Sequence, residues 1–68
     1  MYKNLKAEMK KRRIKQNDIA RVLNLSRQSL SYKMRGKRDF KKSEMEQIKR
    51  FLAVEMPLDE LFKNEAKD

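Results

Sequence analysis

The sequence has no cysteine and no histidine among its 68 residues. These two absences exclude disulfide bonds, thiol nucleophiles, imidazole bases and the usual zinc sites. Long apolar runs are missing as well: the longest is Phe51-Leu52-Ala53-Val54, whereas a membrane helix needs roughly 20 apolar residues. The first residues also lack the apolar stretch of a signal peptide. We therefore expect a cytoplasmic protein with no membrane partner, no metal site and no cofactor.

Catalytic groups are also scarce. Only 38% of the residues are hydrophobic, so a chain of this length buries one compact core and little more. The carboxylates form no catalytic pair, because Asp39 stands among cations and Asp59-Glu60 suits the start of a helix. We therefore expect a protein that is not an enzyme and takes no small-molecule ligand.

Charged residues, in contrast, are abundant and make up 43% of the sequence. The sequence has 19 Lys and Arg against 10 Asp and Glu, a formal net charge of +9. Residues 1–42 carry 15 basic and 3 acidic side chains, whereas residues 43–68 carry 4 basic and 7 acidic ones. This division predicts one surface that binds a polyanion, backed by a neutral or acidic face. A highly charged, solvated surface without a partner is the alternative.

The sequence pattern is helical throughout. Glycine and proline occur once each, good helix formers dominate, and no stretch alternates long enough to predict a strand. Apolar residues recur three and four positions apart, as in Tyr2, Leu5 and Met9. We predict a compact all-α domain over residues 1–63, with a frayed tail over residues 64–68. Its five helices are expected at about 2–12, 16–23, 26–34, 43–53 and 57–63.

Several residues mark the ends of these helices. Asn24 follows the second helix, and asparagine tolerates the left-handed conformation that ends helices. Ser26 can accept a hydrogen bond from the free amides that begin the third helix, which Gly36 ends. Ser43 and Glu46 have capping-box spacing at the start of the fourth helix, and a start one or two residues earlier is the alternative.

The second and third expected helices are short and are joined by the four residues Leu23 to Ser26. Two short helices with a joint that holds a left-handed residue form a helix-turn-helix unit. In such a unit the first helix crosses the DNA backbone, and the second places its N-terminal side chains in the major groove. Ala20 is small enough to let the second of these helices pack closely.

Three stretches carry a resemblance to a known family. They are Gln16–Leu30 with the sequence QNDIARVLNLSRQSL, Gly36-Lys37 with Phe40, and Leu58–Phe62. Over about residues 4–62 the chain resembles the DNA-binding domains of the phage Cro and repressor type, also named after xenobiotic-response-element regulators. The resemblance implies a five-helix, lambda-repressor-like fold that binds a double-stranded DNA operator as a homodimer. It also implies a transcriptional regulator, a Cro-like repressor, in a bacterial cell or a phage-infected host cell.

The resemblance also implies roles for single residues. Gln16 matches a glutamine that contacts a phosphate, and Arg27, Gln28 and Tyr32 match positions that read bases, with Ser31 beside them. Arginine suits guanine and glutamine suits adenine, because each side chain can form two hydrogen bonds with that base. For Ser31 and Tyr32 simple exposure to solvent is the alternative. The residues expected to contact phosphates are Gln16, Asn17, Ser26, Lys33, Arg35, Lys37 and Arg38.

The chain departs from the family pattern in three places. Met9 and Met34 stand where several members have a buried arginine and glutamate, and Lys15 stands where a small polar cap is usual. An apolar pair can replace a buried ion pair without loss of stability. The segment Glu55-Met56-Pro57 lengthens the joint between the last two helices. The candidate dimer interface comprises Phe51, Val54, Met56 and Phe62, unless all four belong to the core.

Two other functions remain open on the sequence alone. A protein-interaction module, such as an antirepressor or an antitoxin-like partner, would use the same helices only as a scaffold. A non-specific nucleic-acid binder would combine the basic surface with exposed aromatic rings for stacking, and Tyr32 is the one good candidate for such a ring.

Overall fold

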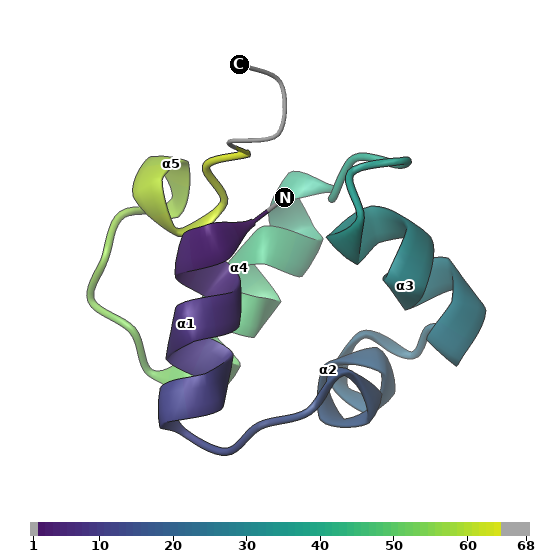
Figure 1. The fold of residues 1–68 in the computed structure, drawn as a ribbon, viewed down its shortest axis with the longest axis horizontal. Helices are drawn as coiled ribbons and strands as arrows, with labels where there is room; N and C mark the ends of the chain where they lie inside the picture. Colours follow the sequence, from purple (N-terminus) through teal and green to yellow (C-terminus); the bar gives the residue numbers. More distant parts are fainter. Residues whose placement is uncertain (1, 65–68) are drawn as a thin grey trace.

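The computed structural model describes residues 2–64, so Met1 and residues 65–68 of the expected tail lie outside the described residues. Within residues 2–64 the chain forms five helices and no strand, which confirms the all-α class (Figure 1). None of the described helices has the length and apolar character needed to cross a membrane. The helices are α1 (Lys3–Lys11), α2 (Gln16–Leu23), α3 (Arg27–Met34), α4 (Lys42–Leu52) and α5 (Leu58–Leu61).

The helices pack around one centre, in a body that measures 29 × 25 × 21 Å. Helix α2 packs against α3 and α4, and α5 packs against α4 and α1. As a result α3 and α5 lie on opposite sides of the molecule (Figure 1). Helix α3 therefore has one face available to a partner.

Each helix contributes a fully buried apolar residue to a single core. Leu5, Ile19, Leu30, Ile48 and Leu61 are each at most 1% exposed. Burying a leucine or isoleucine contributes roughly 1.5–3 kcal/mol, so this set accounts for much of the drive to fold. A second part of the core is an aromatic cluster whose rings meet edge to face, with centroids 5.2–6.0 Å apart: Tyr2, Phe40 and Phe62.

Two of the expected helix ends are confirmed. Asn24 adopts the left-handed conformation, with φ 58° and ψ 42°, directly after α2. The Ser26 hydroxyl accepts a hydrogen bond from the amide of Ser29 at 3.1 Å and caps α3. The joint between the two helices is closed by the amide of Leu25, which donates to the carbonyl of Ala20 at 2.9 Å. Asn24 and Ser26 therefore fix how the chain passes from α2 into α3.

Other helix ends differ from the prediction. The expected capping box of Ser43 and Glu46 is wrong: α4 starts at Lys42, and Glu44 accepts a hydrogen bond from the Lys41 amide at 2.9 Å. The same carboxylate of Glu44 also accepts a hydrogen bond from the Lys33 side chain of α3, and the start at Lys42 agrees with the alternative of an earlier start. Helix α1 is one residue shorter than expected at each end, and the last helix is a single turn that ends at Leu61 rather than at residue 63.

Gly36 occupies a position that a larger residue would strain. Its φ is +82°, and a Cβ atom there would lie 3.0 Å from the side-chain nitrogen of Asn64. We expect Gly36→Ala to lower the free energy of unfolding by about 1 kcal/mol and the Tm by about 4–8 °C, measured by thermal denaturation. Ser43→Ala, at an exposed position of α4, is the matched control and should leave the Tm nearly unchanged. An equal Tm in both variants would contradict this account.

Candidate nucleic-acid interface

The N-terminal turns of α2 and α3 are held by local hydrogen bonds. At the start of α2 the Lys15 amide donates to the Asp18 carboxylate at 3.0 Å. At the start of α3 the Ser26 hydroxyl serves as the cap, and it also donates to the Ser29 hydroxyl at 2.9 Å. These bonds fix the backbone of the first turn of each helix. The side chains of these two turns consequently project from a defined framework.

An open hollow of about 440 Å³ lies between these two helix starts. Every side chain that lines it is polar or charged, and two carry a positive charge. The positive ends of the α2 and α3 helix dipoles lie in the same region, and they favour an anion there. The residues that line the hollow are Lys15, Gln16, Asn17, Arg27, Gln28 and Ser31.

The four residues expected to read bases lie together on α3, and two of them are exposed. Arg27 and Gln28 are exposed, whereas Ser31 and Tyr32 are half-buried. The Gln28 amide group donates to the Tyr32 hydroxyl at 3.3 Å, and the Lys37 ammonium lies 5.9 Å from the centre of the Tyr32 ring. Tyr32 therefore contacts two neighbouring side chains and supports Gln28 from one side.

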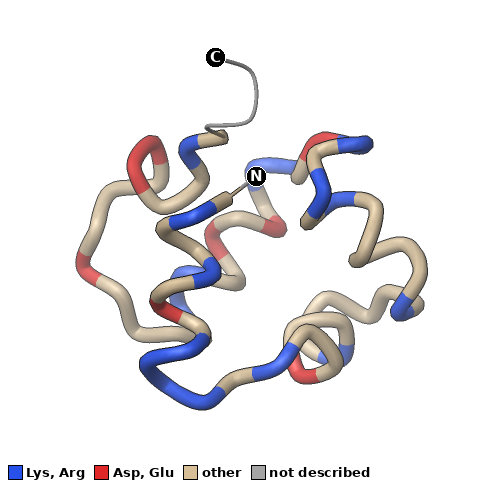
Figure 2. Tube along the Cα trace, in the orientation of Figure 1, with Lys and Arg blue, Asp and Glu red and all other residues tan. Residues whose placement is uncertain are grey.

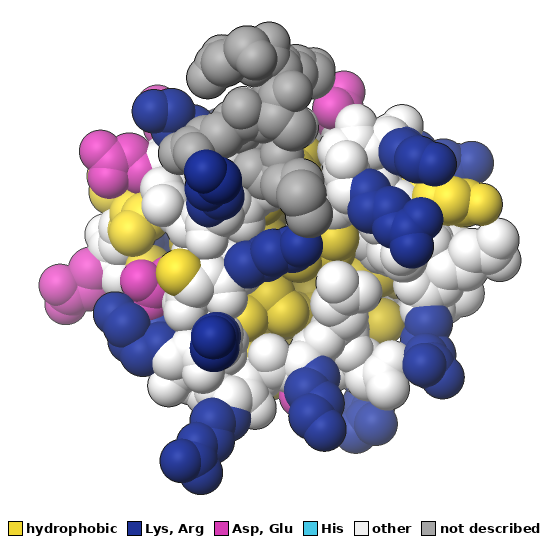
Figure 3. All heavy atoms as spheres, in the orientation of Figure 1, with side chains coloured by type: hydrophobic (Ala, Val, Ile, Leu, Met, Phe, Trp, Pro, Cys, Tyr) yellow, Lys and Arg dark blue, Asp and Glu magenta, His cyan; other side chains and the backbone are white. Residues whose placement is uncertain are grey.

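Most residues expected to contact phosphates are at the surface. Gln16, Asn17 and Ser26 are exposed around the hollow, although the Ser26 hydroxyl is engaged as a helix cap. Basic side chains gather over the loop after α3 and along the lower edge of the molecule, while acidic ones gather on the side of α5 (Figure 3). Between the end of α3 and the first residue of α4, the exposed basic residues are Arg35, Lys37, Arg38, Lys41 and Lys42.

Lys33 is the exception, because its side chain points toward α4 and is mostly buried. Its side chain is 10% exposed and its ammonium lies 2.6 Å from the carboxylate of Glu44, which is 13% exposed. The prediction that Lys33 joins the exposed cations after α3 is therefore wrong. Lys33 lies three residues after Leu30 and beside Met34 on the inner face of α3, so the helix itself directs this lysine toward α4.

The environment of Glu44 shifts its acidity. Burial alone raises the pKa of this carboxyl. Hydrogen bonds from the Lys33 side chain and the Lys41 amide lower the pKa, as do the positive charges of both lysines. These effects outweigh burial, so the pKa of Glu44 lies below its usual value. The folded state therefore releases this proton more readily than the unfolded chain. Glu44 links α3 to the start of α4 through its charged form.

The lowered pKa of Glu44 predicts a loss of stability in acid. Its stabilising contribution is complete above the unfolded pKa, about 4.5, and is lost as the pH falls below that value toward the folded pKa. We expect Glu44→Gln to make the fall in unfolding free energy below pH 4.5 shallower, measured by urea denaturation across that range. Glu46→Gln, at an exposed position of α4, should leave the fall as steep as in the wild type. Identical curves for Glu44→Gln and the wild type would contradict the prediction.

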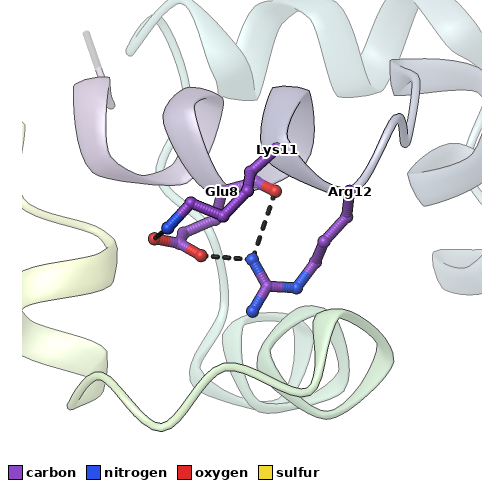
Figure 4. Close-up of polar contacts among 3 residues, drawn as sticks. All are labelled: Glu8, Lys11 and Arg12. Carbon is purple, nitrogen blue, oxygen red and sulfur yellow. Dashed lines mark hydrogen bonds and ion pairs between the residues drawn. The ribbon is translucent and has the colours of Figure 1, made fainter.

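The basic cluster at the end of α1 is partly neutralised by Glu8. Arg12 donates a hydrogen bond to the Glu8 carboxylate, and the Lys11 ammonium lies 3.6 Å from its other oxygen (Figure 4). The hydrogen bond from Arg12 is the largest cause of a lowered pKa for Glu8. Met9 and Met34 are 6% and 1% exposed and belong to the core.

The candidate dimer interface is divided by the structure. Val54 and Phe62 are each 8% exposed and pack in the core, so their assignment to an interface is wrong. Phe51 is 44% exposed, and Met56 is half-buried. The sequence analysis missed Val22, which is 37% exposed.

Val22 and Phe51 lie close together on the surface. Both line a shallow depression between α2 and α4, together with Asp18 and Arg21. Its edge carries one negative and one positive side chain, so the exposed apolar surface is small and flanked by charge. Val22 follows the buried Ile19 by three positions, so helical spacing alone does not mark it as exposed.

Across residues 2–64 no group of three or more acidic side chains is placed to hold a metal ion. Comparison with known proteins finds no family model, no curated protein and no solved structure that matches this chain. The assignment of a function consequently depends on the geometry of the surface itself.

Proposed function

We propose that this protein is a sequence-specific DNA-binding transcriptional regulator, a Cro-like repressor that occupies an operator. Helices α2 and α3 form its helix-turn-helix unit within a lambda-repressor-like domain, and α3 enters the major groove. The observation that carries the proposal is the polar hollow where the N-terminal turns of α2 and α3 meet, with Arg27 and Gln28 exposed at its edge. The left-handed Asn24 and the Ser26 cap support it, because they give the joint a fixed and short path.

Base reading follows from the chemistry of the two exposed side chains. Arg27 can donate two hydrogen bonds to the O6 and N7 atoms of guanine, and Gln28 can exchange two with the N6 and N7 atoms of adenine. Each such pair contributes roughly 1–3 kcal/mol of discrimination against another base. Tyr32 holds Gln28 through its hydroxyl, which restricts the directions in which the Gln28 amide can point.

Phosphate contacts supply the remaining affinity. The exposed cations Arg35, Lys37 and Arg38 follow α3, and Gln16 and Asn17 open α2 beside the hollow. Such contacts fix the register of a protein on the duplex but carry no sequence information of their own. Because one domain makes few base contacts, we propose that it binds as a homodimer with its recognition helices about 34 Å apart, one turn of DNA.

A protein-interaction module is the second candidate, and one observation favours it. Val22 and Phe51 expose apolar surface at the same depression, away from the hollow. This surface suits a protein partner, since aromatic residues such as Phe51 are enriched at protein interfaces. A non-specific nucleic-acid binder is less favoured, because Tyr32 is half-buried and the exposed ring of Phe51 lies on α4 and not at the hollow.

The proposal is tested by selecting binding sites from a duplex library of random sequence, at two salt concentrations. We expect a palindromic motif, as two half-sites about one turn apart would produce. Binding that fades as salt rises, with no motif enriched, would contradict base reading and leave only phosphate contacts. Absence of any DNA binding would direct attention to protein partners at Val22 and Phe51.

A further inference from the structure

The turn between α1 and α2 concentrates positive charge beside the hollow. Five of the six residues from Lys10 to Lys15 are basic. Figure 2 shows this blue stretch running from the end of α1 to the start of α2. The hydrogen bond and ion pair with Glu8 engage Arg12 and Lys11. Within the described part of the chain, no carboxylate pairs with the side chains of Lys10, Arg13 and Lys15, and all three are exposed.

The backbone of this turn holds Arg13 in an unfavourable conformation. Its φ is 57°, in the left-handed region where glycine is the usual residue because other side chains are strained. Hydrogen bonds from the Arg13 amide to the Lys10 carbonyl at 3.1 Å and from the Ile14 amide to the Met9 carbonyl at 2.8 Å close the turn. Ile14 then packs against the core. Arg13 thus ends α1 in the same left-handed conformation that Asn24 adopts after α2, and it places a cation between Lys10 and Lys15.

The turn is continuous with the proposed DNA-reading surface. Lys15 both ends the turn and lines the hollow beside Arg27 and Gln28. The six residues from Lys10 to Lys15 comprise the last two residues of α1 and the four residues that join it to α2. Phosphates of one DNA strand follow each other every ~3.4 Å along the helix axis, so cations gathered in one short turn suit neighbouring phosphates of one strand.

We propose that Lys10, Arg13 and Lys15 form a second phosphate-binding surface, which contacts the DNA backbone outside the base pairs read by α3. This inference rests on the proposed function, because it places the same duplex on the same side of the molecule. The surface lengthens the DNA footprint and raises affinity for any sequence. It leaves the preferred motif unchanged, since phosphate contacts do not distinguish bases.

The test is the triple variant Lys10→Gln/Arg13→Gly/Lys15→Gln. Each phosphate contact contributes about 0.9 to the slope of log K against log salt concentration. We expect the slope of the triple variant to be less steep by about 2–3, measured by fluorescence anisotropy with the duplex recovered by selection and with a duplex of random sequence. The matched control Lys49→Gln/Arg50→Gln/Lys63→Gln removes three cations from α4 and the chain after α5, and its slope should change by less than about 1.

The single substitution of Arg13 distinguishes an effect on DNA binding from an effect on protein stability. Arg13→Gly should keep or raise the Tm, because glycine accepts the left-handed conformation, and should still make the slope less steep by about 1. A triple variant whose slope equals that of the control would overturn the inference even if the wild type is sequence-specific. If the wild type shows no sequence preference but the slope still falls in the triple variant, the second surface is supported and the proposed function fails.

Discussion

Arg27→Ala/Gln28→Ala is expected to bind the recovered operator scarcely better than a shuffled duplex. Both side chains are exposed at the hollow on the first turn of α3, and each can form a two-hydrogen-bond contact with a base. Their loss should cost about 2–6 kcal/mol of discrimination, or about 30-fold to 10⁴-fold in relative affinity. Binding to the shuffled duplex should fall only slightly, because the cations after α3 remain. Both affinities are measured by fluorescence anisotropy at one salt concentration.

The matched control has the same composition on another helix. Gln47 and Arg50 are both exposed on α4, so Gln47→Ala/Arg50→Ala removes one amide and one guanidinium group away from the hollow. This variant should keep the operator preference of the wild type. If the two double variants lose discrimination equally, Arg27 and Gln28 do not read the bases.

Glu44→Ala is expected to be the most destabilising single change outside the apolar core. It leaves the ammonium of Lys33, whose side chain is 10% exposed, without a charged partner in a partly desolvated site. It also removes the acceptor of the Lys41 amide at the start of α4. Together these losses should lower the free energy of unfolding by about 2–4 kcal/mol, a large part of the total for so small a domain. Urea denaturation measures the change.

A double variant distinguishes the effect of the unpaired Lys33 charge from the effect of losing the acceptor for the Lys41 amide. Lys33→Met/Glu44→Gln removes both charges and keeps an amide oxygen that can accept from Lys41. Because an apolar or neutral pair often replaces a buried ion pair at little cost, this variant should stay within about 1 kcal/mol of the wild type. A Glu44→Ala variant as stable as this double variant would show that Lys33 finds water when Glu44 is absent, and would contradict the account.

The helices and their junctions were largely predictable from the sequence, because the relevant signals are local. Side chains such as Leu5 and Met9 repeat at the spacing of one helix face, and both are buried. Asn24 ends α2 by its own backbone conformation, and Ser26 caps α3 by a hydrogen bond with a residue three positions away. The turn between α2 and α3 could therefore be located without any tertiary information. The placement of Arg27 and Gln28 at the surface follows from the same cap.

The exposure of a side chain was wrongly predicted where it depends on a residue that is distant in the sequence. Lys33 follows Leu30 by three positions, which hinted at the inner face, but only the fold shows that Glu44 lies opposite to neutralise it. Val54 and Phe62 carry no local sign that distinguishes a core residue from an interface residue. The exposure of Val22 and Phe51 likewise depends on how α2 packs against α4. Sequence spacing gives the face of a helix but not the neighbour that covers it.

The most direct test of the central claim is to map the backbone amide signals of the protein by NMR while duplex DNA is added. The account predicts that the largest shift changes occur at the first turns of α2 and α3, around Asn17, Arg27 and Gln28, with smaller changes after α3 and little change in α5. Largest changes on the α4 and α5 surfaces, or none anywhere, would contradict the claim that the hollow is the DNA-binding surface.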